Sequence, residues 1–174
     1  GLMIGSIEDL IRYRLHNEHT IERLDAREID TEHGPFRLHT YRDQISRCLH
    51  YALLRGEADA DLPTLVRVHM QNPLADALHW RRADFGPAVG DVLAAIAREG
   101  RGALVLLGET QTSENLLARI REQPGPAVRS GGMAEWRRNG AGSQILADLG
   151  LGKLRVLGTP RKQIGLAGFG LEVV

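Results

Sequence analysis

Arginine and histidine alternate with apolar residues in one short segment, residues 64–70. Successive side chains of a strand point to opposite faces, so valine and methionine would share one face while Arg67 and His69 share the other. A guanidinium group can bind phosphate through paired hydrogen bonds, and an imidazole can transfer a proton near neutral pH. We therefore predict a strand with the hydrophobic core on one face and a binding site on the other.

The sequence offers few residues for metal-binding or nucleophilic chemistry. The single cysteine, Cys48, excludes an internal disulfide and a multi-thiolate metal site within one chain, and we expect it to be a small buried hydrophobic residue of a strand. His16 and His19 are three residues apart, and His69 and His79 lie further along the chain. Because no cluster of acidic residues accompanies them, we expect surface or hydrogen-bonded histidines; a histidine metal site is the alternative.

Length and charge limit the class of protein. The chain has 174 residues, which suits a single domain, and its 22 basic and 22 acidic residues balance. A nucleic-acid-binding or membrane-surface protein would need a net basic face, so we exclude both kinds of partner. The sequence contains neither a signal peptide nor an apolar run of about 18 residues, which predicts a soluble, cytoplasmic protein.

Apolar periodicity indicates which elements position these side chains. In the first half we predict a helix, a hairpin of two strands and two further strands, at residues 6–17, 22–30 with 36–41, 45–54 and 64–70. In the second half we predict three helices, two strands and one loop. The helices lie at 89–97, after Thr112 or Ser113, and at 142–149; the strands lie at 103–107 and 154–157, and the loop at 123–134. Antiparallel hairpins followed by alternating strands and helices predict an α/β fold with mixed sheets.

Several segments together resemble the GTP cyclohydrolase II family of riboflavin synthesis. The resemblance is collinear and covers most of residues 20–174. It rests on Thr31–Phe36, Tyr41–Asp43, Pro63–His69, Asn72–Asp76, Arg82–Gly86, Ile96–Gly102, Gly142–Gly150, Arg155–Lys162 and Gly165–Val174. It implies the fold of that family for residues 18–174 and a homodimer.

The first 17 residues resemble a different segment. In bifunctional riboflavin proteins a similar stretch joins a 3,4-dihydroxy-2-butanone 4-phosphate synthase domain to the cyclohydrolase domain that follows. The resemblance therefore implies that residues 1–17 are a linker helix and that the chain is a piece of a longer protein. An ordinary N-terminal helix is the alternative.

The resemblance does not extend to the residues that bind zinc in this family. The family binds zinc through three cysteines spaced C-x10-C-x-C, which hold the ion and leave a position open for water. Asn72, Ala83 and Phe85 stand at the matching positions. An amide is a poor zinc ligand and the other two side chains are none, so we predict that zinc is absent. The family's glutamine is replaced by Ala88, its Glu-Gly-Arg triplet by residues 110–112, and its tyrosine has no counterpart in residues 123–132.

Other positions of the family's site keep residues that could act. The resemblance implies nucleotide or phosphate contacts for four of them and a vestigial catalytic role for two, namely Arg67, His69, Arg161 and Lys162, then Glu135 and Arg137. The alternative is that all six are surface charges or form ion pairs that support the fold.

Three functions fit this pattern. We expect a non-catalytic domain beside a 3,4-dihydroxy-2-butanone 4-phosphate synthase domain, with a structural, dimerisation or regulatory role in which GTP or a related nucleotide binds. The second is a nucleotide hydrolase with a zinc-independent or altered site. The third is a protein–protein module with an exposed apolar patch. Trp80 and Phe85 would fill the space left by zinc, or would pack in the core.

Overall fold

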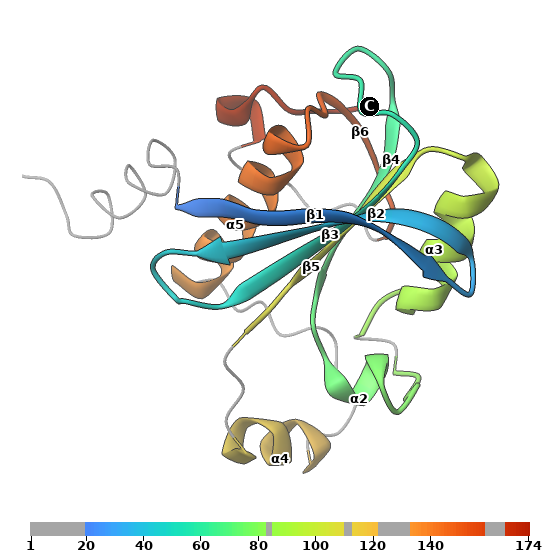
Figure 1. Ribbon diagram of the computed structural model, residues 1–174. Helices are drawn as coiled ribbons and strands as arrows, with labels where there is room; N and C mark the ends of the chain where they lie inside the picture. The colour runs from blue at the N-terminus through green and yellow to red at the C-terminus, as the bar shows by residue number, and fades with distance from the viewer. Residues whose placement is uncertain (1–19, 83–84, 110–112, 122–132, 159–165) are drawn as a thin grey trace, which may run out of the picture.

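A seven-stranded mixed sheet organises the protein (Figure 1). The computed structural model describes residues 20–82, 85–109, 113–121, 133–158 and 166–174, with the side chains of 133–139 and 167 left out. The strand order is β1-β2-β3-β5-β4-β6-β7. The strands are β1 (Ile21–Thr31), β2 (Gly34–Asp43), β3 (Leu49–Arg55), β4 (Thr64–Met70), β5 (Gly102–Leu107), β6 (Lys153–Val156) and β7 (Glu172–Val173). Pairing is antiparallel from β1 to β5 and parallel from β5 to β7, which confirms the predicted mixed α/β fold.

The N-terminal hairpin is longer than its apolar pattern predicted. Its strands extend to Ile21 and Asp43, and a two-residue turn joins Thr31 to Gly34. The hydroxyl of Thr31 donates to the carbonyl oxygen of Gly34 at 2.8 Å and accepts the backbone N–H of His33 at 3.1 Å. These bonds satisfy the polar groups of the tight turn and fix the register of the two strands.

The strand predicted from residue 45 begins instead at Leu49. The carboxylate of Asp43 accepts the backbone N–H of Ile45 and the hydroxyl of Ser46, both at 2.8 Å, and so holds the chain in a turn. Cys48 lies in this connection and is half-buried, so the prediction of a buried strand residue was wrong.

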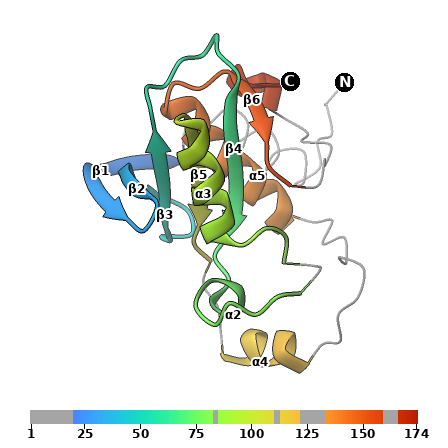
Figure 2. The same cartoon turned by 90° about the vertical axis from the view of Figure 1, so that its right-hand side faces the viewer.

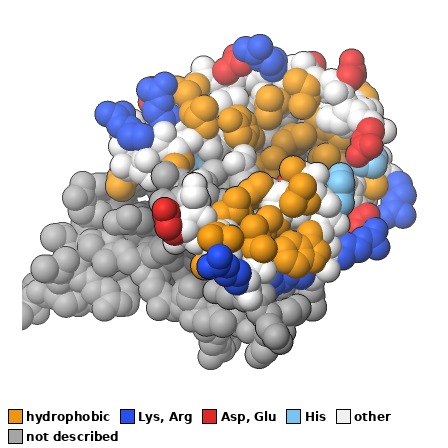
Figure 3. Space-filling model, turned by 90° about the horizontal axis from the view of Figure 1, so that it is seen from below, with side chains coloured by type: hydrophobic (Ala, Val, Ile, Leu, Met, Phe, Trp, Pro, Cys, Tyr) orange, Lys and Arg blue, Asp and Glu red, His pale blue; other side chains and the backbone are white. Residues whose placement is uncertain are grey.

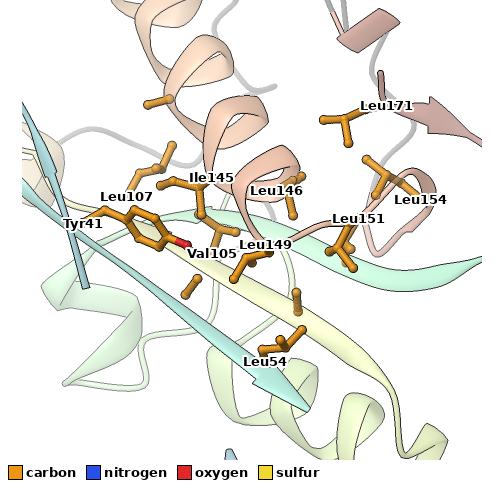
Figure 4. Packing of buried hydrophobic residues seen from close by; sticks show 14 of the residues in the cluster. Tyr41, Leu54, Val105, Leu107, Ile145, Leu146, Leu149, Leu151, Leu154 and Leu171 are labelled. Carbon is orange, nitrogen blue, oxygen red and sulfur yellow. The ribbon is translucent and has the colours of Figure 1, made fainter. Parts of the chain in front are cut away.

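Helix α5 (Met133–Asp148) covers one face of the sheet. Figure 4 shows Ile145 and Leu149 pointing from this helix toward Tyr41 and Val105 of the sheet, and all four side chains are buried. The helix begins nine residues before the predicted start at 142, because residues 133–140 lack the apolar period that marks a buried face. The predicted loop is therefore wrong at residues 133 and 134, and its residues 123–132 lie outside the described part.

Helix α3 (Val89–Glu99) covers the opposite face, as Figure 2 shows. It ends at Gly100, as predicted, and buries Val92, Leu93 and Ile96 against Leu65 and the strands beside it. Both faces of β4 therefore lie against hydrophobic core. This corrects the expectation of a core on one face alone: on the α3 side, Leu65 is part of the core and Arg67 and His69 follow it along the strand.

Three short helices complete the described structure. They are α2 (Pro73–Asp76), α4 (Ser113–Arg121) and a 3-10 turn at Leu166–Phe169. The predicted strand at 154–157 is β6, shifted by one residue. Among the described residues, none of the helices has the length and apolar character needed to cross a membrane. The predicted helix at 6–17, with His16 and His19, lies outside the described residues.

Candidate functional site

The candidate site lies where β4 ends and the chain turns into α2. β4 and β5 run parallel here, and ligands of open α/β sheets bind beyond the carboxyl ends of parallel strands. Arg67 and His69 alternate with Val66 and Val68 along β4; the valines pack toward α5, so the two polar side chains lie on the α3 side. The structure thus brings Arg67 and His69 onto one face, as the alternation predicted.

A buried hydrogen-bond network joins His69 to the start of α2. The imidazole Nε2 of His69 lies 2.8 Å from Oδ1 of Asp76, and the other carboxylate oxygen accepts the backbone N–H of Asn72 at 2.7 Å. His69 is 5% exposed and Asn72 is 4% exposed. The side-chain oxygen of Asn72 accepts the backbone N–H of Leu74 at 3.2 Å, so Asn72 is the N-cap of α2.

Asp76 is the residue of this network to which the sequence assigned no role. It stands seven residues after His69, on a helix of four residues. The motif Asn-Pro followed by an acidic residue is a helix-start signal, and it was the one clue that a carboxylate would turn back toward the strand.

Arg67 is held between two loops. Its Nη1 donates to the carbonyl oxygen of Leu157 at 3.0 Å, across 90 residues of sequence. A Cβ atom built at Gly86 would lie 2.8 Å from Nη2, and one at Gly158 would collide with Nη1. Both glycines have positive φ, +75° and +120°, so side-chain size and backbone conformation both favour glycine there. The guanidinium therefore links the loop before α3 to the end of β6.

Aromatic and arginine side chains stack in the loop after α2. The rings of Trp80 and Phe85 meet edge to face with centroids 6.1 Å apart, and the guanidinium of Arg82 lies 5.4 and 4.8 Å from their centroids. Arg119 of α4 also lies 6.0 Å from the Phe85 ring. Trp80 is 38% exposed, so the prediction that it packs in the core was wrong.

The side chains at two of the three matching cysteine positions have other contacts. Asn72 caps α2, and the ring of Phe85 packs against Trp80 and arginine; Ala83 lies outside the described residues. Within the described part of the chain, no group of three or more His, Cys, Asp or Glu side chains could hold a metal ion. The side chains of Asn72 and Phe85 therefore do not fit a zinc ion.

The remaining predicted site residues are not brought together by what the structure describes. Glu135 and Arg137 lie in helix α5, but the structure does not describe their side chains. Arg161, Lys162 and residues 110–112 also lie outside it. His79 is exposed in the loop after α2, and Ala88 precedes α3 without a side-chain cap.

A hollow of about 740 Å³ lies between the N-terminal hairpin and the end of α5. His39 lines it, is 5% exposed, and has no hydrogen-bond partner for either ring nitrogen among the described residues. Burial lowers the pKa of His39, and the positive charges of Arg23 and Arg37 lower it further. Arg23 is paired with Asp148, its Nε donating to Oδ2 at 2.8 Å. The sequence assigned no role to this polar cluster, because its members come from strands and a helix far apart in the chain.

Comparison with known proteins agrees with this fold. The family model for GTP cyclohydrolase II matches residues 22–174. A Pseudomonas syringae pv. tomato protein named 3,4-dihydroxy-2-butanone 4-phosphate synthase is 44% identical over 179 residues, covering 100% of this chain and 48% of its own. The riboflavin biosynthesis protein RibBA of Bacillus cytotoxicus is 38% identical, covering 97% of this chain and 45% of its own.

A solved structure also matches this chain. It is RibBX from A. baumannii, described as a two domain 3,4-dihydroxy-2-butanone 4-phosphate synthase, with a TM-score of 0.70 and 36% identity. The match covers 100% of this chain and 45% of that one, and the chain spans about half the length of the curated relatives it matches. The resemblance inferred from the sequence is confirmed: the chain belongs to the GTP cyclohydrolase II family.

Proposed function

We propose that this chain is a GTP cyclohydrolase II-like domain that binds no zinc and does not hydrolyse GTP. We propose further that it has a structural or regulatory role beside a 3,4-dihydroxy-2-butanone 4-phosphate synthase domain. The observation that carries the proposal is the use of Asn72, at the first ligand position, as the buried cap of α2.

The chemistry of the donor set supports the loss of the metal. Catalytic zinc needs three protein ligands directed at one point and an open position for water. The single acceptor oxygen of the Asn72 side chain is directed at the backbone of α2, and the phenyl ring of Phe85 has no donor atom. Structural zinc sites draw on the order of 10 kcal/mol from their ligands, which a lone amide does not replace.

The contacts of Arg67 and His69 support a role in the fold. Each uses polar atoms for a contact within the protein, to the Leu157 carbonyl and to the Asp76 carboxylate. Truncating either would therefore disturb the loops that they join, whether or not a nucleotide binds. A regulatory nucleotide would have to bind alongside these contacts.

The relatives' names agree with this division of labour. Two proteins that match the whole of this chain with about half of their own length are named for the synthase activity alone. In the same way we assign catalysis to a synthase domain in the longer protein, and a supporting role to the part that this chain represents.

Calorimetric titration with GTP, with and without added zinc, tests the proposal when the same samples are assayed for turnover and metal content. We expect no turnover and no stoichiometric zinc. GTP binding that does not depend on zinc would favour the regulatory role, and no binding would favour the structural one. Zinc-dependent hydrolysis of GTP by the pure protein would refute the proposal.

A further inference from the structure

One buried imidazole in the hollow between the N-terminal hairpin and the end of α5 lacks the contacts that buried polar groups normally make. His39 of β2 is 5% exposed, and neither of its ring nitrogens has a hydrogen-bond partner among the described residues. In a neutral imidazole one nitrogen donates and the other accepts, so each of them needs a partner. Because nearly all buried polar groups in folded proteins are paired, an unpaired imidazole beside a hollow points to a ligand.

The neighbouring strands leave room beside this imidazole. His39 pairs with Ala26 of β1 and with Ala52 of β3, and residues that pair across adjacent strands lie on the same face of the sheet. Because both neighbours end in a methyl group, the imidazole is flanked by two short side chains. The hollow measures about 740 Å³, within the range of roughly 300–1,000 Å³ that is usual for small-molecule sites.

The hollow lies at the opposite end of the parallel strands from the candidate site. Gly100 and Gly150 line it, and they precede β5 and β6, whereas the candidate site follows the last residue of β4. Its lining also differs from the surface seen in Figure 3, where hydrophobic side chains gather. Six charged residues line the hollow, namely Arg23, Arg37, Arg55, Glu28, Glu57 and Asp148. A small charged ligand therefore suits this hollow better than an apolar partner.

The charges around His39 favour an anion. Burial is the largest cause of the lowered pKa of His39, and the guanidinium groups of Arg23 and Arg37 lower it further. The carboxylates of Asp148 and Glu28 raise this pKa by less, so the electrostatic potential at the imidazole is positive. A negatively charged group is attracted to such a position, whereas a cation is repelled. In agreement, no group of three or more metal-binding side chains occurs in the described part of the chain.

Arg37 supplies further donors on the same face of β2. It stands two residues before His39, so the two backbone positions are about 6.6 Å apart on that face. Its Nε donates to Glu28 at 2.9 Å, and its two terminal nitrogens make no hydrogen bond or ion pair with other described residues. The side chain is 60% exposed, so it is free to turn toward an anion. A guanidinium group can hold a phosphate through two parallel hydrogen bonds.

We propose that Arg37 and His39 bind the phosphate group of a small ligand in this hollow, through the terminal guanidinium nitrogens and the imidazole N–H. Both imidazole nitrogens are covered in the structure, so the Arg37 side chain turns away from Glu28 as the anion enters. The inference goes beyond the function proposed above, because the site shares no residue with the one at the end of β4. It binds its ligand whether or not GTP binds there, so the two proposals can fail separately.

Carbon-13 NMR of the histidine rings in the full chain measures the binding, with the His39 signal assigned by its absence from His39→Phe. Sulfate is the first probe, because it resembles phosphate and keeps its charge near neutral pH. It should shift the His39 signal saturably and raise the pKa of this imidazole, since an anion stabilises the protonated form. A rise of one pKa unit corresponds to about tenfold tighter binding of sulfate to that form. Sodium chloride at the same ionic strength should produce no saturable shift.

Two further probes identify the source of the phosphate group. Inorganic phosphate and glycerol 3-phosphate present the same kind of anion, and only the second carries a small organic group. Tighter binding of the ester would assign the site to a small phosphorylated molecule, and equal binding would assign it to the free ion. Either result supports the proposal.

Substitution of an exposed arginine tests the assignment of the donors. Arg37→Gln removes the guanidinium from the hollow and should weaken sulfate binding at least about tenfold. Arg27→Gln is the matched control, because Arg27 is 67% exposed, is also paired with a nearby carboxylate and lies outside the hollow; it should leave binding unchanged. No saturable shift of the His39 signal, an equal response to chloride, or normal binding by Arg37→Gln would each overturn the proposal.

Discussion

Replacing Asn72 by alanine removes one hydrogen bond at the position where the family has its first zinc ligand. The Asn72 oxygen accepts the backbone N–H of Leu74 at 3.2 Å, and both residues are almost completely buried. The backbone N–H of Asn72 still reaches Asp76 in this variant, so the change is confined to the cap. We expect Asn72→Ala to destabilise the protein.

The size of the effect follows from the burial. Loss of an asparagine cap costs about 0.5–2 kcal/mol, and a buried N–H left without an acceptor costs about 1–3 kcal/mol. The two figures describe the same lost bond, so we expect about 1–3 kcal/mol. A protein of this size loses about 2–4 °C of melting temperature per kcal/mol, which predicts a decrease of roughly 2–12 °C.

Thermal unfolding followed by circular dichroism measures this decrease. Asn72→Ser is the matched control, because a serine hydroxyl is also a good cap acceptor and should recover most of the stability. If Asn72→Ala melts at the wild-type temperature, the amide is not committed to the cap. The main support for the absence of a metal ligand at this position would then be gone.

Two further substitutions test the buried imidazole of His39 and the contact between Gly158 and Arg67. Because burial lowers the pKa of His39, the unfolded chain takes up a proton first on acidification; stability should therefore fall from about pH 6.5 down through the folded-state pKa. Urea midpoints across this range should fall less steeply for His39→Leu, and an unchanged slope would contradict the assignment. Gly158→Ala should cost about 1–3 kcal/mol through its φ of +120° and its collision with Arg67. Part of that cost should disappear in an Arg67→Ala background, and equal costs in both backgrounds would show that the guanidinium is not involved.

Local patterns were sufficient for most elements. The helix at 89–97 has apolar residues at helical spacing and a glycine stop, and it forms as predicted. Errors arose where a side chain or a distant element overrides the local pattern. The hydrogen bonds of Asp43 hold the chain in a turn, so β3 begins at Leu49 instead of residue 45. Residues 133–140 are helical although their sequence lacks an apolar stripe.

The family, the mixed α/β fold and the shared face of Arg67 and His69 could all be predicted from the amino-acid sequence. All three follow from residue order, since collinear motifs and a period of two need no knowledge of distant contacts. The contacts of these residues could not be predicted in this way, because they are made with distant segments of the chain. The bond from Arg67 to Leu157 spans 90 residues, and the direction of the Asn72 amide depends on the backbone of α2. Periodicity reports which side of an element is covered, whereas a hydrogen bond depends on the position and direction of one atom in another segment.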